Sequence, residues 1–388
     1  MQITSFGISP KRLFRWSRNF FTGIVGMVFL TVLPGWLAAA EGWQEEWNRT
    51  IEAANREGRV AVMHGGGAST AMRDLIKEGF QKKFPGIKVD LLVAGGRSIA
   101  PRALSERRAG RFGWDIYMGG TTTALRLFMP AGVFDPMRPA FILPEVSDPK
   151  NWFGGKIDFA DDAQTYNLAF GGYVIPPFAF NTRLVKENEI RSFWDLLEPK
   201  WQGKVLMFDP RQPGAGLASA TFAYVQPSLG KKYLQGLLEK QRVGLVRNYR
   251  QLLEEVARGN YYIGIGVHQA IYKELTAKGL PLGRFSADNI KEGSYLTTAT
   301  ASMGLVNRAP HPNAAKVFIN WFLGKEAQLQ YSKASGYWSR RVDVPQDHLD
   351  PGIVPREEKY DSYQANYKEK YVKQRDEIVQ FLKTVIKR

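Results

Sequence analysis

The first third of the chain repeats one unit three times, and this unit is a short apolar strand, a turn of small residues and an amphipathic helix. The strands are expected at residues 59–64, 87–93 and 114–118. The turns that follow them are expected at residues 65–70, 94–98 and 119–123. Successive units of this kind build a mostly parallel sheet whose turns gather at the carboxyl ends of the strands. The repeat therefore predicts an α/β fold with loops placed to bind a ligand.

The middle of the chain repeats the alternation of strands and helices and predicts a second sheet. Strands are expected at residues 204–208, 243–247 and 261–267, and helices at 231–240 and 249–258. A chain of 388 residues is long for one hydrophobic core, because single cores stop growing near about 250–300 residues. We therefore expect two α/β lobes.

The first forty residues are typical of a secretory signal peptide. Four basic residues precede a mostly apolar run at residues 20–33, and Ala38 and Ala40 supply the small residues of a cleavage site. A permanent anchor is the alternative, because residues 20–40 approach the roughly 20 residues that span a bilayer. Pro34 and Gly35 favour cleavage, since they break a helix just before the small residues. Lys11 and Arg12 resemble a twin-arginine signal, so the export route stays open between that pathway and the general one.

The chain contains no cysteine. It therefore has no disulfide, no thiolate metal site, no cysteine nucleophile and no lipid-modified cysteine after the signal. No second apolar run is long enough to span a bilayer. We expect the exported protein to be free in the periplasm.

The net charge of +16 is strongly basic. Residues 1–40 contain four basic and no acidic residues, so the exported chain keeps a charge of +12. The basic residues are scattered among acidic ones, and export argues against a nucleic-acid partner. An anionic small ligand, or a simple effect on solubility, remains as the explanation.

Several segments, in order along the chain, resemble one family: the extracellular solute-binding proteins with the type 2 periplasmic-binding-protein fold, in the branch that includes ferric-iron receptors. The likeness extends over residues 58–345. The segments that carry it are VAVMHGGGAST at 60–70, GFQKKFPGIKV at 79–89, WDIY at 114–117, FWDLLEPKWQGKV at 193–205, VARGNYYIGI at 256–265, HPNAAK at 311–316, KEAQ at 325–328 and GYWSRR at 336–341.

The resemblance implies two lobes, each a mixed sheet flanked by helices, joined by a hinge of two crossing strands with the ligand in the cleft between them. On this chain the crossings would fall near residues 173–181 and 295–304. Lobe 1 would then comprise residues 41–172 and 297–350, lobe 2 residues 173–296, and a helical tail residues 351–388. The implied function is that of a monomeric receptor that delivers a small ligand to an ABC permease in the inner membrane, without catalysis or cofactor.

The turns at the strand ends supply the candidate ligand-binding residues. Backbone N–H groups at helix N-termini favour anions, and the turns of the two lobes would face one another across the cleft. The candidates are Gly67, Ser69, Thr70, Arg97, Ser98, Thr121 and Thr122 in lobe 1, and Gly214, Gly216, His268 and Gln269 in lobe 2. Taken singly, Ser69, Thr70 and Thr121 are equally explained as helix N-caps.

Arg97 carries the most weight among these candidates, because its guanidinium fork can hold a carboxylate or phosphonate at two points. The alternative is a solvated arginine in a loop. His64 precedes the first turn and is a further residue that could face the cleft, although a single histidine is more often structural.

The ferric receptors of this family hold iron with a His in the first turn, a Glu in the third and two adjacent Tyr. The matching positions here are Gly67, then Gly119 or Gly120, then Gln269 and Ala270. Because Fe(III) needs anionic oxygen donors, this set does not bind the free ion. No metal site is expected, and the resemblance points to an anionic organic molecule or a metal chelate.

Two other functions fit the sequence less well. An exported hydrolase would need a nucleophile elbow or a metal cluster, and the chain has no Gly-x-Ser-x-Gly, no His-Glu-x-x-His and four histidines in all. A sugar receptor would use aromatic residues, but the 10 Trp and 16 Tyr fall mainly at the spacing of helix cores. The segment at residues 359–387 has apolar residues near helical spacing and predicts a surface helix.

Overall fold

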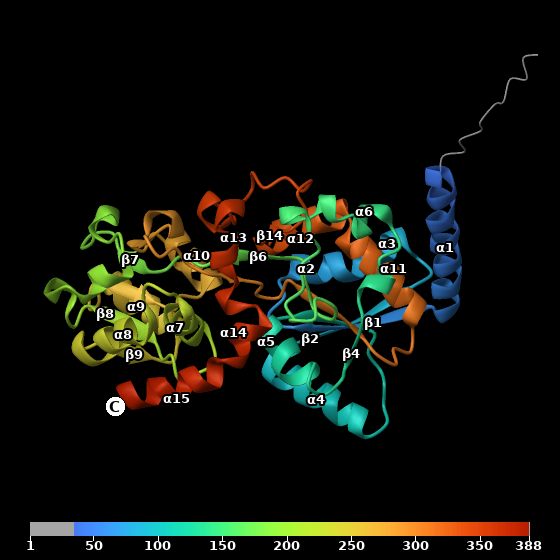
Figure 1. Cartoon of the computed structure of the whole chain (residues 1–388). Helices are drawn as coiled ribbons and strands as arrows, with labels where there is room; N and C mark the ends of the chain where they lie inside the picture. The colour runs from blue at the N-terminus through green and yellow to red at the C-terminus, as the bar shows by residue number, and fades with distance from the viewer. Residues whose placement is uncertain (1–34, 388) are drawn as a thin grey trace, which may run out of the picture. The chain divides into compact units, whose positions relative to one another are not determined.

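The computed structural model describes residues 35–387 (Figure 1). The chain divides into two compact units, residues 1–41 and 42–388. The predicted signal peptide falls mostly outside the described residues, so its cleavage stays a prediction. Helix α1 (Gly35–Glu57) packs Trp47, Ile51 and Ala54 against a hydrophobic core that also contains Val62, Phe80 and Phe318. No helix within residues 35–387 combines the length and the apolar character that a bilayer crossing requires.

Lobe 1 is built on a six-stranded mixed sheet with the order β2-β1-β3-β13-β4, and β5 pairs with β13. Strand β1 runs parallel to β2 and β3, whereas β13 is antiparallel to β3, β4 and β5. The strands are β1 (Arg59–Gly65), β2 (Lys88–Ala94), β3 (Ile116–Gly119), β4 (Phe134–Asp135), β5 (Leu168–Ala169) and β13 (Ser302–Val306). The three predicted strand, turn and helix units therefore form the parallel part of this sheet.

Helices cover both faces of the lobe 1 sheet, because alternate residues of β1 point to opposite sides. Val62 packs with Phe80 and Phe318 in one core, and Met63 packs with Ile99 in the other. The first core contains residues of α2 (Thr70–Asp74), α3 (Phe80–Lys83), α11 (Pro312–Leu323) and α12 (Lys325–Ser335). On the opposite side lie α4 (Gly96–Arg108) and α5 (Thr121–Thr123) (Figure 1). The short α6 (Pro144–Ser147) adds Val146 to the first core.

Lobe 2 is built on a five-stranded mixed sheet with the order β11-β7-β10-β8-β9. Its strands are β7 (Ala179–Asn181), β8 (Val205–Phe208), β9 (Gly244–Val246), β10 (Ile263–Ile265) and β11 (Leu282–Arg284). Along β8, Val205 and Met207 face one core while Leu206 and Phe208 face the other. The helices that fill these cores are α7 (Ala215–Val225) and α8 (Gly230–Gln235) on one side, and α9 (Tyr249–Arg258) and α10 (Gln269–Ala277) on the other.

A three-stranded sheet of β6 (Gly171–Val174), β12 (Leu296–Thr297) and β14 (Trp338–Ser339) lies where the chain passes between the two larger sheets. Strands β6 and β12 are antiparallel, with Val174 opposite Leu296. Each of the two long strands predicted here is divided into two. Pro176 and Pro177 separate β6 from β7 because proline has no N–H for a sheet. Ala299, with a φ of 48°, turns the chain between β12 and β13. The two mixed sheets and the crossing pair match the predicted architecture, whereas the exact domain limits stay a prediction.

The C-terminal tail differs from the single surface helix predicted for residues 359–387, and that prediction is wrong. The tail folds into α13 (Tyr360–Tyr363), α14 (Glu369–Lys373) and α15 (Arg375–Val385), and Tyr367, Ile378 and Leu382 are fully buried. Lys368 has an extended backbone that interrupts the helix, with a ψ of 143°. The interruption turns the side chain of Lys368 inward to Asp158.

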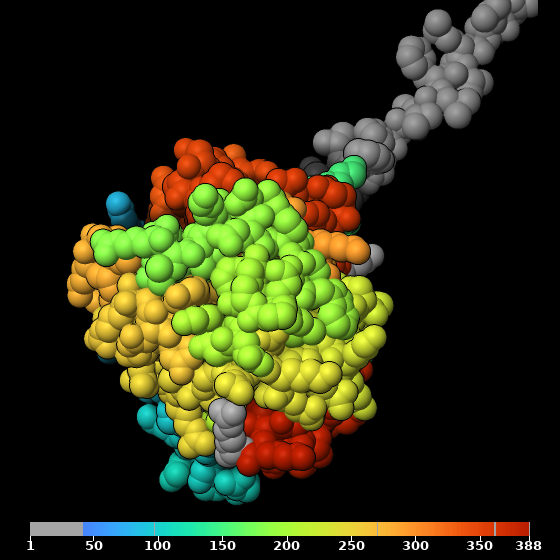
Figure 2. Space-filling view, turned by 90° about the vertical axis from the view of Figure 1, so that its left-hand side faces the viewer, coloured from blue at the N-terminus to red at the C-terminus, as the bar shows by residue number. Residues whose placement is uncertain are grey.

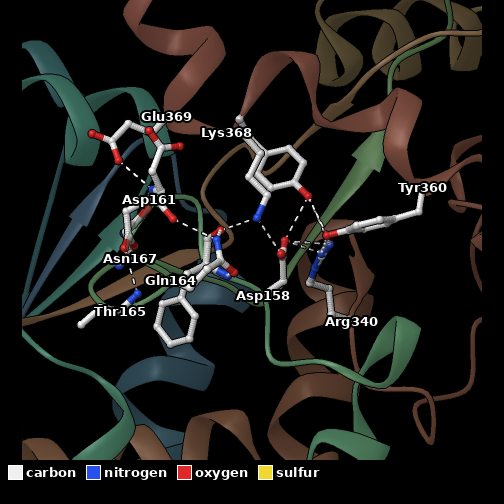
Figure 3. Close-up of polar contacts among 12 residues, drawn as sticks. Asp158, Asp161, Gln164, Thr165, Asn167, Arg340, Tyr360, Lys368 and Glu369 are labelled. Carbon is white, nitrogen blue, oxygen red and sulfur yellow. Dashed lines mark hydrogen bonds and ion pairs between the residues drawn. The ribbon is translucent and has the colours of Figure 1, made fainter.

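The tail is attached to both lobes. In lobe 1, Asp158 accepts hydrogen bonds from Lys368 at 2.6 Å, Arg340 at 3.0 Å and Tyr367 at 3.0 Å (Figure 3). In lobe 2, apolar residues of α15 join the core that contains α7. Figure 2 shows these last residues, in dark red, against the yellow surface of lobe 2. The tail is therefore an integral part of the folded unit.

Candidate ligand-binding cleft

A cavity of about 680 Å³ is lined by both lobes, by the crossing strands and by the C-terminal tail. Four parts of the chain that are distant in sequence therefore meet at one site. The polar and small residues that line it are Gly96, Thr122, Thr123 and Arg126 from lobe 1, Gly214, Tyr249 and His268 from lobe 2, Tyr173, Tyr295 and Thr297 from the crossing segments, and Asn366 and Arg375 from the tail.

The lobe 2 wall is built around the N-terminus of α7. Gly214 precedes this helix with a φ of 147°, and a Cβ there would lie 2.3 Å from the hydroxyl of Tyr249. The hydroxyl of Tyr249 accepts a hydrogen bond of 3.0 Å from the backbone N–H of Ala215, and the ring stacks on Phe208 at 4.1 Å. This close packing requires glycine at position 214 and places the positive end of the α7 dipole at the cavity.

His268 lies beside Tyr249, with a distance of 5.1 Å between the ring centroids. The residue is partly exposed to solvent. The protein around the imidazole still desolvates it, and this desolvation lowers its pKa. The ring is therefore neutral at pH 7 and can either donate or accept a hydrogen bond.

Arg375 is the buried cation of the cavity. Its Nη1 donates to Thr122 Oγ1 at 2.7 Å, and its Nη2 donates to the Asn366 carbonyl at 2.9 Å and to the Asn366 side-chain oxygen. Burial lowers the pKa of Arg375 to about 10, which leaves the guanidinium charged at pH 7. Its Nε has no hydrogen-bond acceptor among the described residues.

Arg126 is a second arginine of the cavity lining, with a different environment. Its side chain is exposed, and Nη2 donates to both carboxylate oxygens of Asp376 at 2.6 and 2.8 Å. Its charge is therefore already paired within the protein.

Two tyrosines of the crossing segments form the inner wall. Burial raises the pKa of both Tyr173 and Tyr295, so both are neutral phenols. Tyr173 stacks on Tyr337 at 5.4 Å, and the hydroxyl of Tyr295 shares a hydrogen bond of 3.0 Å with Ser219. These rings offer an apolar surface to the body of a ligand, beside the charge of Arg375.

Three of the residues proposed from the sequence line this cavity: Thr122, Gly214 and His268. Gln269 lies in a narrow neighbouring pocket, where its side-chain oxygen accepts a hydrogen bond from Arg284. For Arg97, the backbone lies in the first turn of α4, and its side chain is outside the part of the chain that the structure describes. Its role in binding stays a prediction.

The other proposed residues lie away from the cavity lining. Ser69 is the N-cap of α2, where it accepts a hydrogen bond of 3.2 Å from Met72, and Ser98 donates to the Gly95 carbonyl at 3.0 Å. Thr121 is buried, and Gly216 is packed so tightly that a Cβ would lie 2.0 Å from the Phe208 carbonyl oxygen. Gly67 and Thr70 are exposed. A contact of these residues with a ligand stays a prediction.

His64 is fully buried and does not line the cavity. Its Nδ1 lies 3.4 Å from the Gly66 carbonyl oxygen, and desolvation lowers its pKa to about 4. Within residues 35–387, no three His, Cys, Asp or Glu side chains lie close enough together to hold a metal ion.

Arg375, Asn366, Tyr173, Tyr249 and Tyr295 are cavity residues that the sequence reasoning missed. Tyr173 and Tyr295 fall on the predicted crossing strands and Tyr249 at the start of a predicted helix, but none of the three was predicted to contact a ligand. Arg375 and Asn366 lie in the tail, where no recognisable motif surrounds them. No pattern in the sequence links the tail to the turn at Thr122, 253 residues away.

Residues 60–337 match the family model of the bacterial extracellular solute-binding proteins. The chain belongs to this family. The match confirms the resemblance on which the two-lobed fold was predicted. The matched segment ends before the C-terminal tail.

Curated relatives of this solute-binding protein include one from Salmonella typhimurium, whose name gives it as a candidate 2-aminoethylphosphonate-binding periplasmic protein. It is 29% identical over 194 residues, which are 49% of this chain and 57% of the relative. The match thus spans little more than half the length of the relative.

Solved structures of periplasmic binding proteins confirm the fold of this solute-binding protein. The Trichodesmium FutA protein, in complex with iron and citrate, has a TM-score of 0.65 at 18% identity and covers 84% of this chain and 99% of its own. The AfuA protein of Actinobacillus pleuropneumoniae, with bound fructose 6-phosphate, has a TM-score of 0.57 at 19% identity over 85% of this chain and 99% of its own. At these identities the likeness concerns the fold alone.

Proposed function

We propose that this solute-binding protein is the periplasmic receptor of an ABC importer, which captures a small organic anion or a metal chelate in the cleft and delivers it to a permease. The observation that carries the proposal is the cavity itself. Both lobes and the crossing strands line it, so a rotation of the lobes about β6 and β12 would enclose a ligand.

The export and assembly parts of the proposal rest on the sequence. Residues 1–40 have the pattern of a secretory signal, and the family is extracellular. The exported chain is expected to act as a monomer and to contact its permease in the inner membrane. No catalytic step is part of the proposal, since the family is one of binding proteins.

The anionic class of ligand is supported by the chemistry of the cavity. A buried guanidinium, the N-terminus of α7 and two threonines of α5 offer donors for an anion. The ligands named for the three relatives above are a phosphonate, citrate with iron, and a sugar phosphate, and each of them carries an anionic group. A neutral sugar is the second candidate, because Tyr173, Tyr249 and Tyr295 line the same cavity.

Thermal unfolding of the protein purified from the periplasm tests the proposal. A ligand that binds only the folded state raises the melting temperature. We expect a shift with at least one of 2-aminoethylphosphonate, fructose 6-phosphate, citrate and ferric citrate, and no shift with fructose. A shift with fructose alone would select the second candidate.

Small-angle scattering tests the closure of the lobes. The radius of gyration should fall when the ligand identified by thermal unfolding is added at saturation. An unchanged radius would contradict closure around the ligand.

A further inference from the structure

Arg375 differs from the other buried arginines of the protein. Three arginines are buried among those whose side chains the structure describes: Arg340, Arg341 and Arg375. Arg340 pairs with Asp158 at 3.0 Å and Arg341 pairs with Asp343 at 2.8 Å. Arg375 is 6% exposed and has no carboxylate partner within the described residues. No carboxylate of the described residues therefore compensates its positive charge.

The hydrogen bonds of Arg375 hold the guanidinium in place without neutralising it. Its three contacts are with neutral oxygens, those of Thr122 and Asn366. A guanidinium has five N–H donors, so these contacts leave two unused, and Nε is one of them. Burying a charge without a counter-ion costs free energy of folding. A ligand anion that enters the cavity would supply the missing counter-ion.

The space beside Arg375 is the cavity described above. Thr122 and Asn366, which orient the guanidinium, also line this cavity, and so does Tyr295. Thr122 belongs to lobe 1, whereas Asn366 belongs to the tail, so the guanidinium is clamped between two separate segments. A clamped guanidinium is preorganised to bind an oxyanion.

We propose that Arg375 is the anion-binding residue of the cleft, and that the C-terminal tail supplies it to recognise a carboxylate, phosphonate or phosphate group of the ligand. The proposal rests on the proposed function and specifies how its ligand is recognised. Thr122 and Asn366 are the positioning residues that hold the guanidinium.

The tail is well suited to supply a binding residue. It lies outside the family match, which ends at residue 337. Its two ends are fixed, by Lys368 on Asp158 in lobe 1 and by Ile378 and Leu382 in the lobe 2 core. Arg375 lies between these two attachment points in the sequence, and it lines the cavity between the lobes. The tail therefore carries Arg375 to a position between the two lobes, where it can contact a ligand.

The test uses isothermal titration calorimetry with 2-aminoethylphosphonate, fructose 6-phosphate and citrate as anionic probes and fructose as the neutral probe. Three variants are compared with the parent protein. Arg375→Met keeps the size of the side chain and removes its charge, whereas Arg375→Lys keeps the charge and loses the planar guanidinium. Lys383→Gln is the control, because it removes an exposed cation of the same helix outside the cavity.

We expect Arg375→Met to raise the Kd of the bound anion by at least about thirtyfold, the lower end for losing one partner of a buried charge pair. Arg375→Lys should restore part of this loss, because an ammonium keeps the charge but does not match the fork. Lys383→Gln should bind like the parent. Circular dichroism and the melting temperature of Arg375→Met without ligand separate lost binding from lost folding.

The outcomes distinguish the two proposals. An anion that binds Arg375→Met as tightly as the parent would overturn this inference and leave the receptor function in place. Binding of fructose alone would also overturn this inference, and it would select the neutral sugar as the ligand class of the receptor. If the parent binds none of the four probes, a wider set of carboxylates and phosphonates that also fails to bind would overturn the proposed anion receptor, and the role of Arg375 with it.

Discussion

Two buried sites of positive charge in this protein are built in opposite ways. In lobe 1, Arg340 and Lys368 share the carboxylate of Asp158, and the tyrosines Tyr360 and Tyr367 complete the network (Figure 3). In the cleft, the described residues give Arg375 neutral hydrogen-bond partners and no carboxylate. The first cluster is internally compensated and attaches the tail. The second leaves a charge available, and we infer that a ligand compensates it.

The two cations of the lobe 1 cluster also set the protonation state of Asp158. Burial by itself would raise its pKa, but the charges of Arg340 and Lys368 outweigh this and hold the pKa below its usual value. The carboxylate therefore stays ionised at pH 7. A buried charge with a good partner is maintained by the fold and gives no reason to expect a ligand.

The largest expected effect is that of Asp158→Asn on folding. The substitution leaves Arg340 and Lys368 buried without a counter-ion, which should lower the free energy of unfolding by about 3–5 kcal/mol. Urea denaturation measures this change. Asp162→Asn is the matched control, since Asp162 is exposed and its pair with Lys373 should contribute about 0–1 kcal/mol. Equal effects of the two substitutions would contradict the structural role of the Asp158 cluster.

A smaller effect is expected from His64, a buried imidazole that is kept neutral by desolvation and has no carboxylate partner among the described residues. Its pKa is lowered by burial from 6.5 to about 4, so the unfolded chain binds a proton more tightly than the folded one. Its contribution to stability is complete above pH 6.5 and is lost as the pH falls toward 4, by about 3 kcal/mol in total.

The measurement for His64 is urea denaturation at pH 7 and at pH 4.5. The parent should lose more stability between these two pH values than the His64→Gln variant does. Parallel losses in the two proteins would show that His64 is not the group responsible.

Arg375→Met should change the free energy of unfolding of the ligand-free protein by no more than about 1 kcal/mol, because the lost hydrogen bonds are offset by removal of an uncompensated charge. Arg340→Met is the comparison, and it should be clearly more destabilising because it breaks the Asp158 pair. If both substitutions destabilise the protein equally, Arg375 is a structural residue like Arg340.

The smallest expected effect is that of Asp376→Asn, which removes the partner of Arg126 at the rim of the same cavity. Stability should hardly change, since an exposed pair contributes about 0–1 kcal/mol. Affinity for an anionic ligand should increase by up to about threefold at low salt, because the released charge attracts it. High salt should abolish the increase through screening. An increase that persists at high salt would contradict this account.

The fold could be predicted because its strands, turns and helices are formed by residues that lie close together in the sequence. The small-residue turns at residues 65–70, 94–98 and 119–123 follow apolar strands, and this order along the chain requires parallel strands with covering helices. Thr122, Gly214 and His268 were predicted at the cleft for the same reason, since each follows a strand of its sheet. The breaks at Pro176 and Ala299 were not predicted, although the proline pair is visible in the sequence, whereas the positive φ of Ala299 is seen only in the structure.

The role of each arginine was decided by the tertiary structure alone. Arg126, Arg340 and Arg375 are the same residue type in the sequence, and they differ in the carboxylate that the fold places beside them: Asp376, Asp158 and none among the described residues. The local pattern of the tail indicated a surface helix, and nothing in it revealed that Lys368 and Arg375 would turn inward. Charge compensation depends on distances between segments that are hundreds of residues apart, whereas strands, turns and helices depend on neighbours along the chain.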